Sequence, residues 1–209
     1  MIKLSHHKKK EKNMVVVLQM YITLMPVILA GILNMVWCKS SILKNAAVPI
    51  DQGKVLKDGQ RLFGENKTWK GFGGYLLWGS VSGLVWGWFN QLLPYLEAHN
   101  YLYTYHANQV PYNLLMGLAF GAAYAICELP NSFLKRRAGI RPGKPAKGQV
   151  QLLFFLLDQI DSLLGCVWVL TLVYPMSAAF YSLFVILGGF THIGINVILY
   201  KLHLRKNIF

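Results

Sequence analysis

The sequence predicts an all-α, polytopic integral membrane protein with about five transmembrane helices and cytoplasmic loops. Only 14% of its 209 residues are charged, against about 25% in an ordinary soluble domain. Several apolar runs are long enough to cross a bilayer, which takes roughly 20 helical residues. Lys and Arg gather between these runs, so the net charge of +13 indicates contact with membrane lipids or a phosphorylated ligand. We expect no nucleic-acid partner.

The elements follow in order along the chain. Residues 1–13 are a short basic tail, for which a solvated, disordered segment is the common case. The first apolar run, 14–38, is too long for a signal-peptide core and no cleavage site follows it, so we expect a retained spanning or re-entrant helix. The other spanning helices are expected near 72–96, 108–130, 151–174 and 178–200. No internal repeat or linker divides residues 14–209, which predicts a single membrane domain.

Glycines and cysteines add predictions about packing. Gly79, Gly83 and Gly87 recur every four residues, and Gly117 and Gly121 repeat that spacing. Small residues at this spacing are typical of closely packed membrane helices. The three cysteines lack metal-ligand spacing and are expected to be small buried residues: Cys38, Cys127 and Cys166.

The distribution of Lys and Arg predicts the orientation. Residues 39–71 hold seven, 131–150 hold six and 201–209 hold three, whereas 97–107 hold none. Five spans place the three basic segments on one side, which the positive-inside rule makes cytoplasmic. The protein is therefore expected in the cell membrane, with its polar site facing the cytoplasm. The basic tail, with five more bases, is expected outside.

Two carboxylates stand inside the fourth apolar run. Asp158 and Asp161 lie three residues apart, and thus on one helix face. A charge near the middle of a spanning helix costs about 2.5–3.5 kcal/mol. A divalent cation beside a cluster of bases would offset that cost, and the preceding segment 131–150 supplies the bases. The alternative is an acidic pair that only caps or salt-bridges within the bundle. His192, on the last helix, is more simply a hydrogen-bonded core residue than a catalytic one.

A second basic element precedes the helix expected at 72–96. Lys67 and Thr68, in GENKTWKG, would lie near the free N–H groups that open this helix, where anions are favoured. The stretch lacks the spacing of a Walker A loop. Mg²⁺ takes carboxylate oxygens and substrate phosphates together. Bases from two loops and carboxylates from a third element therefore predict phosphoryl or nucleotidyl transfer.

Four blocks carry a family resemblance. They read PIDQGKVLKDGQRLFGENKTWKG, ELPNSFLKRRAGIRPGK, LLDQIDSLLG and HIGINVILYKLHLRK. In this order, over residues from about 14 to the C-terminus, they resemble the CDP-archaeol synthase family, which is related to the CDP-diacylglycerol synthases. LDQIDS is similar to the LDRIDS of those relatives. Their Lys-Asp before PGHGG is absent, and the chain has RPGK at residues 141–144, which suits the archaeol-type branch.

The resemblance implies a membrane cytidylyltransferase of phospholipid biosynthesis that uses CTP and Mg²⁺. It would convert a lipid phosphate, of the archaeal ether type or phosphatidate-like, to a CDP-activated lipid and release pyrophosphate. The lipid tails would enter between the glycine-faced helices. Asp158 and Asp161 would hold Mg²⁺ as catalytic residues, and Lys135 and Arg136 would bind phosphate. The remaining implied substrate contacts are Lys67, Thr68, Asp51, Asp58, Glu128, Asn131, Ser132 and Arg137.

Two other function classes stay open on the sequence. A small transporter or channel would use Asp158 and Asp161 as a cation or proton site, but the inverted repeats common in transporters are not seen. A non-catalytic lipid-binding or assembly subunit would need neither the acidic pair nor KTWKG. The sequence also leaves a homodimer open.

Overall fold

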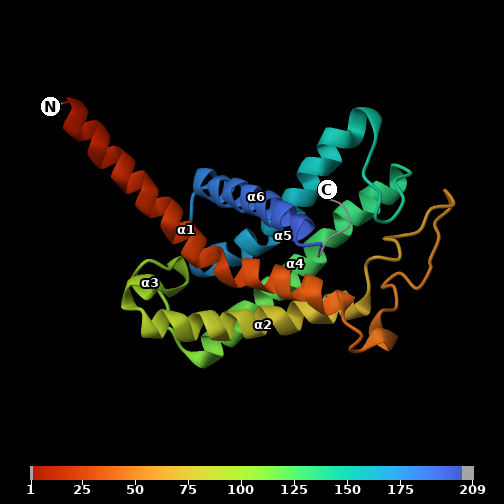
Figure 1. Cartoon of the computed structure of the whole chain (residues 1–209), viewed down its shortest axis with the longest axis horizontal. Coiled ribbons are helices and arrows are strands. Elements are labelled where there is room, and N and C mark those ends of the chain that lie inside the picture. The colour runs from red at the N-terminus through yellow and green to blue at the C-terminus, as the bar shows by residue number, and fades with distance from the viewer. Residues whose placement is uncertain (1, 204–209) are drawn as a thin grey trace.

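Five long helices form the protein (Figure 1). The computed structural model describes the backbone of residues 2–203 and the side chains of residues 11–203. The long helices are α1 (Ile2–Lys39), α2 (Trp69–Leu92), α4 (Val110–Arg137), α5 (Gln151–Val173) and α6 (Ala178–Lys201). The short elements are α3 (Pro94–Ala98) and the 3₁₀ turns η1 (Lys44–Ala46), η2 (Tyr101–Tyr103) and η3 (Gly148–Val150). The all-α prediction is confirmed.

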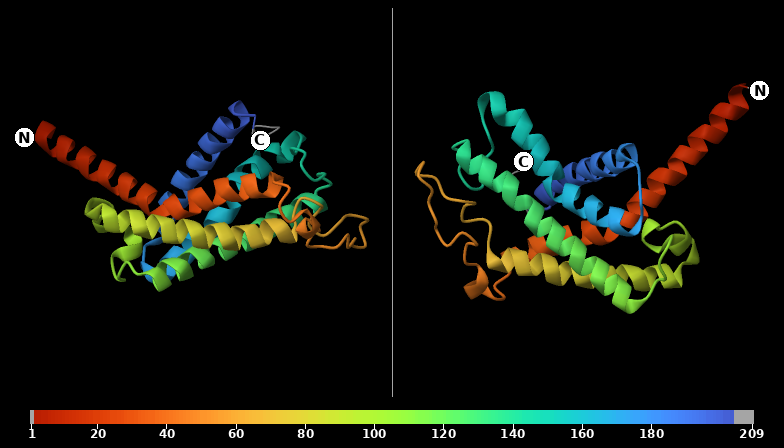
Figure 2. Two further views of the ribbon diagram at one scale, coloured as in Figure 1. Left: turned by 60° about the horizontal axis from the view of Figure 1, so that its bottom comes forward. Right: turned by 180° about the vertical axis from the view of Figure 1, so that it is seen from behind.

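Four of the long helices in the described chain, α1, α4, α5 and α6, are apolar and long enough to span a membrane. The remaining one, α2, has 24 residues and runs beside α4 (Figures 1 and 2). The basic loops 40–68 and 138–147 and the end of α6 lie at one end of the bundle, while α3, η2 and the turn before α6 lie at the other. The start of α1 also projects at that other end, opposite the basic loops.

Two helices extend beyond the ranges expected from the sequence. The segment expected as a solvated tail is helical from residue 2 and continuous with α1. In α4, the helix passes Pro130 and ends only at Arg137, so the basic loop expected over 131–150 begins at residue 138. Proline removes a single N–H donor, and membrane helices tolerate it where neighbours satisfy the freed carbonyl. The basic residues in the last turn of α4 suit the negative end of the helix dipole.

Glycines hold α2 against α4, as predicted. A Cβ atom on Gly79 would lie 2.4 Å from the Gly117 carbonyl oxygen, and one on Gly83 would lie 2.5 Å from the Asn113 carbonyl oxygen. Only glycine allows backbones to approach this closely, which is how small residues drive helix contact in membranes. The two glycine faces close on each other and leave no path between these helices.

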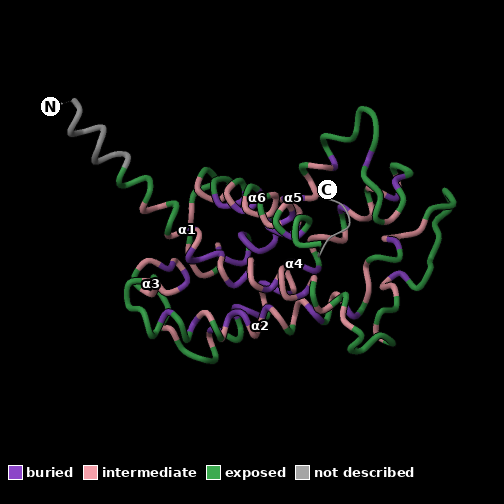
Figure 3. The backbone as a smooth tube through the Cα atoms, in the orientation of Figure 1, coloured by how far each residue is buried: buried purple, intermediate pink, exposed green. Residues whose placement is uncertain are grey.

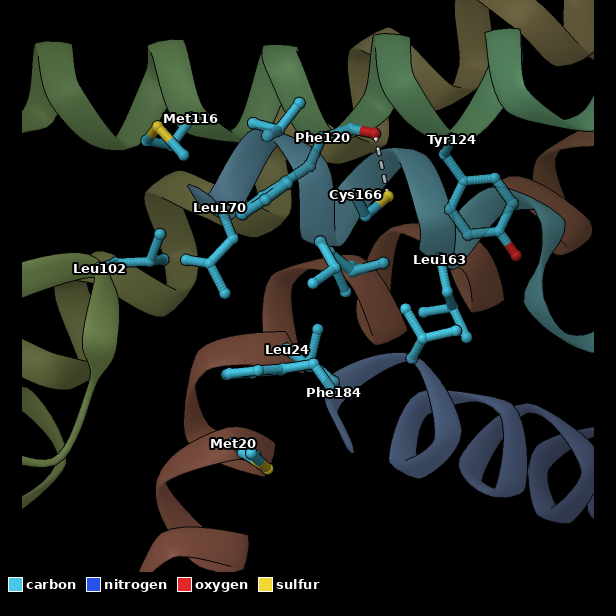
Figure 4. Close-up of a cluster of buried hydrophobic side chains, with 14 residues drawn as sticks. Met20, Leu24, Leu102, Met116, Phe120, Tyr124, Leu163, Cys166, Leu170 and Phe184 are labelled. Atoms are coloured by element: carbon cyan, nitrogen blue, oxygen red, sulfur yellow. Dashed lines mark hydrogen bonds between the residues drawn. The ribbon is translucent and has the colours of Figure 1, made fainter. Parts of the chain in front are cut away.

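The core lies between α1, α4, α5 and α6 (Figures 3 and 4). Its largest fully buried side chains include Met20, Leu170 and Phe184. Cys166 is buried among them, and its thiol faces the Phe120 carbonyl oxygen at 3.5 Å. The prediction of three buried cysteines holds for Cys166 but is wrong for Cys38, which is exposed because it lies in the last turn of α1.

Candidate active site

A cavity of about 1000 Å³ opens at the end of the bundle that carries the basic loops. Its polar part is lined by residues from α4, α5 and the loop before α2, which include Lys67, Thr68, Glu128, Asn131, Ser132, Lys135, Arg136, Asp158 and Asp161. Its apolar part is lined by α1, α5 and α6, which contribute Leu24, Val27, Ile28, Leu163, Ile195 and Leu199. One cavity thus joins a charged basin to an apolar chamber.

The two carboxylates of α5 face one polar edge of α4. The Asn131 side-chain amide donates to Asp158 Oδ1 and to Asp161 Oδ2, each at 2.7 Å. Lys135 Nζ forms an ion pair with Asp158. Asn131 and Lys135 are four residues apart and the acids three apart, so both pairs project from neighbouring turns of their helices. The sequence prediction that these groups share one site is confirmed by this geometry.

Lys67 reaches the site from the loop before α2. Its Nζ lies 2.5 Å from Glu128 Oε2, and the Tyr75 hydroxyl donates to Glu128 Oε1 at 3.1 Å. Burial would lower the pKa of Lys67, but the Glu128 carboxylate raises it above its ordinary value, so Lys67 is charged at neutral pH. The Tyr75 ring stacks on Tyr124 with centroids 4.2 Å apart. Glu128 therefore connects the Lys67 loop, α2 and α4.

Thr68 begins α2. Its hydroxyl oxygen accepts a hydrogen bond from the Gly71 N–H at 3.1 Å, which makes it the N-cap. The predicted position beside the free N–H groups of a helix is confirmed. The cap fixes the direction in which Lys67, one residue earlier, enters the cavity.

Arg136 brings an unpaired charge to the cavity wall. The residue is only 5% exposed, yet its Nε and Nη1 atoms have no hydrogen-bond partner within the described part of the chain. A buried guanidinium without a partner is unfavourable. Lys67 and Lys135 each pair with a carboxylate, so Arg136 is the cation here with uncompensated donors and is suited to bind an anion.

Three predicted substrate contacts lie outside the cavity lining. The Asp51 carboxylate is fully buried and accepts from the backbone N–H groups of Gly53, Phe63 and Gly64 and from Arg61. Burial works against its charge, but the Arg61 guanidinium and these N–H groups hold the pKa of Asp51 well below its ordinary value. Asp58 pairs with Arg137 at 2.8 Å. The structure therefore gives all three residues partners within the protein.

Two residues of the site, Tyr75 and Lys70, were not predicted from the sequence. Tyr75 contacts Glu128, and Lys70, which is buried, donates to the Ser40 carbonyl oxygen at 2.7 Å in the cavity wall. Lys70 stands in the KTWKG stretch, and that signal could have identified it, whereas nothing marks Tyr75 among the aromatics of its helix. His192 lies beside the Gln159 carbonyl oxygen at 3.4 Å. The lipid path expected between glycine-faced helices is wrong, because α2 and α4 are in contact there.

The donor atoms around Asn131 fit a magnesium ion. Mg²⁺ prefers oxygen ligands and is commonly held by one or two carboxylates together with water and substrate phosphates. Asp158 and Asp161 provide the carboxylates, and Asn131 Oδ1 is buried with no hydrogen-bond partner among the described residues. No group of three or more His, Cys, Asp or Glu side chains that could hold a metal ion occurs in this described part of the chain. The two carboxylates supply oxygen atoms of the kind that Mg²⁺ takes together with water and substrate phosphates.

Comparisons with known proteins identify the family of the chain. The family model described as "CarS-like: CDP-archaeol synthase" matches residues 13–209. The chain belongs to the CDP-archaeol synthase family. The CDP-archaeol synthase of Archaeoglobus fulgidus is 33% identical over 175 residues, covering 79% of this chain and 87% of the relative. That of Pyrococcus furiosus is 30% identical over 164 residues, covering 78% and 84%.

A solved structure shows the same fold. It is described as "Structural insight into an intramembrane enzyme for archaeal membrane lipids biosynthesis", with 24% identity and a TM-score of 0.57 over 85% of this chain and 92% of that one. Membership of the CDP-archaeol synthase family makes this chain a CTP:lipid-phosphate cytidylyltransferase, and its four long apolar helices make it an integral membrane protein. Membership therefore decides against the transporter and assembly-subunit readings.

Proposed function

We propose that this enzyme transfers CMP from CTP to an archaeal-type ether lipid phosphate, with Mg²⁺, at the cytoplasmic face of the cell membrane. The observation that carries the proposal is the paired carboxylate site. Asp158 and Asp161 meet Asn131 and Lys135 in the charged basin of a cavity whose other part is apolar. A charged basin suits a nucleotide triphosphate, and the adjoining apolar chamber suits hydrocarbon chains.

The chamber between α1, α5 and α6 supports a lipid as the second substrate. Its walls include the aliphatic side chains of Leu24, Ile28 and Leu199, with the polar Thr191, His192 and Asn196 of α6 beside them. The bilayer interior is as apolar as these side chains, so hydrocarbon chains can pass from the membrane into the chamber at little cost. The chamber and the basin form one cavity, so a lipid held by its chains presents its phosphate to the basin. The archaeal source of the similar enzymes favours an ether lipid.

The chemistry requires orientation and charge stabilisation. A lipid phosphate oxygen attacks the α-phosphorus of CTP, a new P–O bond forms, and the bond to the β-phosphate breaks to release pyrophosphate. The attacking oxygen is already ionised at neutral pH, so no general base is needed. Negative charge grows on the leaving pyrophosphate, and fixed cations stabilise such charge without reorganisation. Arg136 has free donors for this role, and Lys67 and Lys135 stand beside it.

Asp158 and Asp161 would hold the magnesium ion, which when bound shields the phosphate charges and polarises the reacting phosphorus. Asn131 keeps the two carboxylates oriented through its two hydrogen bonds. Lys135 pairs with Asp158 and is placed to contact a phosphate beside it. Glu128 and Tyr75 hold Lys67 in position.

The positive-inside rule supports the cytoplasmic side for this basin. The segments 39–71 and 131–150, which border the cavity at one end of the bundle, together carry 13 of the 21 Lys and Arg residues. CTP would then reach the basin directly from the cytoplasm.

Pyrophosphate release from the purified full-length protein tests the proposal. Assays contain Mg²⁺, one nucleotide (CTP, UTP or ATP) and one lipid, either an ether-lipid phosphate or phosphatidate. We expect turnover with CTP and the ether-lipid phosphate. Asp161→Asn should lower kcat by about 10²-fold or more, the usual effect of losing one electrostatic contact in the transition state. Glu11→Gln, the same acid-to-amide change on the exposed start of α1, is the control and should keep wild-type turnover.

Each part of the proposal has its own contrary result. Wild-type turnover in Asp161→Asn, with unchanged thermal unfolding, would remove the metal assignment. Turnover with phosphatidate and none with the ether-lipid phosphate would overturn the lipid class. Equal rates with UTP and CTP would overturn the nucleotide assignment.

A further inference from the structure

The loop between α1 and α2, residues 40–68, is folded around one buried carboxylate. Asp51 accepts five backbone and side-chain hydrogen bonds from residues 53–64. Two isolated β-bridges, Pro49 with Thr68 and Val55 with Arg61, also tie the loop to itself. A loop this long would otherwise sample many conformations, at a cost of about 1–2 kcal/mol for each residue that is ordered. The α1–α2 loop is therefore one structured unit.

Arg137 joins this unit to α4. Its Nη1 donates to Asp58 Oδ1 at 2.8 Å, and its Nη2 donates to the carbonyl oxygens of Gln60 at 3.1 Å and of Arg61 at 2.5 Å. The guanidinium also lies over the Phe133 ring, with its carbon 5.1 Å from the ring centroid. A planar guanidinium with several fixed donors suits such a multiple contact, which one ammonium group cannot reproduce.

This contact relates two groups of cavity residues. The α1–α2 loop carries Lys67, and the last two turns of α4 carry Asn131, Lys135 and Arg136. Between them the loop packs closely against the segment after α4: a Cβ atom on Gly64 would lie 2.9 Å from Pro142 Cγ and 3.5 Å from Arg136 Nη1. The distance across the basin thus depends on how the loop is held to the end of α4.

We propose that Arg137 is a positioning residue that holds the α1–α2 loop closed over the nucleotide basin. It acts through the loop and not by contact with substrate, because it does not line the cavity and its terminal nitrogens are already bonded to the loop. The proposal rests on the proposed function, in which the basin takes CTP. Loss of the contact lowers the fraction of molecules with a closed loop, and the apparent affinity for CTP falls by the same factor.

The experiment combines limited proteolysis with kinetics on the full-length protein. Lys54 and Lys57 are exposed in the loop, so trypsin cleavage there, located by mass spectrometry in the absence of substrate, reports loop opening. In Arg137→Met we expect the loop-closing equilibrium to fall about tenfold, the effect of about 1.4 kcal/mol. Cleavage follows the open fraction and the KM for CTP follows the inverse of the closed fraction, so both should rise and their fold-changes should multiply to about ten. The kcat at saturating CTP and the KM for the lipid phosphate should change less than about threefold, since a closed loop restores the same site.

Three variants separate this role from others. Lys147→Met removes a cation from an exposed position on the same end of the molecule and should leave both readouts at wild-type values. Arg137→Lys keeps an ion pair with Asp58 but loses the carbonyl contacts, and should fall between wild type and Arg137→Met. Asp58→Asn tests the same contact from the loop side and serves where Arg137→Met unfolds.

Contrary outcomes are distinct. Wild-type cleavage and wild-type KM in both Arg137→Met and Asp58→Asn would overturn the proposal. A fall in kcat with an unchanged KM for CTP would also overturn it and place Arg137 in the chemical step. A wild-type protein without turnover would instead refute the proposed function alone. The proteolysis experiment uses no substrate, so it would still decide whether Arg137 holds the loop.

Discussion

Replacing Gly121 with alanine tests the helix contact that aligns the two halves of the site. A Cβ atom on Gly121 would lie 2.1 Å from the Tyr75 carbonyl oxygen and 2.8 Å from its carbonyl carbon. Non-bonded carbon contacts are optimal at about 3.5–4.0 Å. The backbones of α2 and α4 therefore have to separate by about 1 Å to admit one methyl group.

The magnitude follows from this overlap. Extra methyl groups in a well-packed interior destabilise by about 1–3 kcal/mol, and each kcal/mol shifts Tm by about 2–4 °C in a protein of 150–250 residues. We thus expect Gly121→Ala to lower Tm by about 2–12 °C. The same separation acts on Tyr75, whose hydroxyl lies 3.1 Å from Glu128 Oε1, so turnover should fall as well.

Thermal unfolding in detergent, followed by intrinsic fluorescence, measures the first effect, and pyrophosphate release measures the second. Gly73→Ala is the matched control on α2, because a Cβ atom there meets nothing within 4 Å and alanine is the better helix former. Its Tm should be unchanged or slightly raised. If Gly121→Ala has the same Tm and the same turnover as Gly73→Ala, α2 and α4 do not pack through these glycines.

Three further predictions concern single side chains. Arg136→Gln should lower kcat/KM by about 10²-fold or more without lowering Tm, because it removes a buried charge that lacks partners; a lower Tm with normal turnover would contradict this. Thr68→Ala should lower Tm by about 2–4 °C, the loss of a cap worth about 1 kcal/mol, whereas Thr68→Ser should not. The pKa of Asp51 is lowered in the folded protein, so its contacts stabilise the loop above the ordinary carboxyl pKa of about 3.9. Relative to the intrinsic exchange rate at each pH, hydrogen exchange of residues 52–64 should rise as the pH falls below that value, and Asp51→Asn should show weak protection already at pH 7.

The sequence predicted the membrane class and the acidic site because both depend on a local signal. Apolar runs interrupted by basic segments specify spanning helices, and acidic side chains within an apolar membrane helix require a partner. Asp158 and Asp161 could be placed on one face from their spacing alone. Their neighbours across the site also followed, because Lys135 belongs to a basic segment on the same side of the membrane.

The errors arose where tertiary contacts override local rules. Pro130 was expected to end a helix, but contact between α4 and α5 keeps the helix intact through Arg137. The charge of Arg137 suits a phosphate and that of Asp58 suits a metal ion, yet the structure pairs the two residues with each other. The Tyr75 contact with Glu128 joins residues 53 apart in the chain, and no pattern within one sequence reports such a distance.

The arrangement of the candidate active site depends on how the antiparallel helices α4 and α5 are aligned. Asn131 and Lys135 occupy successive turns of α4 and meet Asp158 and Asp161 on α5. One extra residue between Asn131 and Lys135 would rotate the lysine about 100° around the helix axis. Its ammonium group would then no longer reach Asp158. Extra residues in the connection 138–147 would leave both helix faces where they are, and would act on the site only through the packing of Pro142 against the α1–α2 loop. The spacing within each helix is therefore the stricter requirement of the reaction.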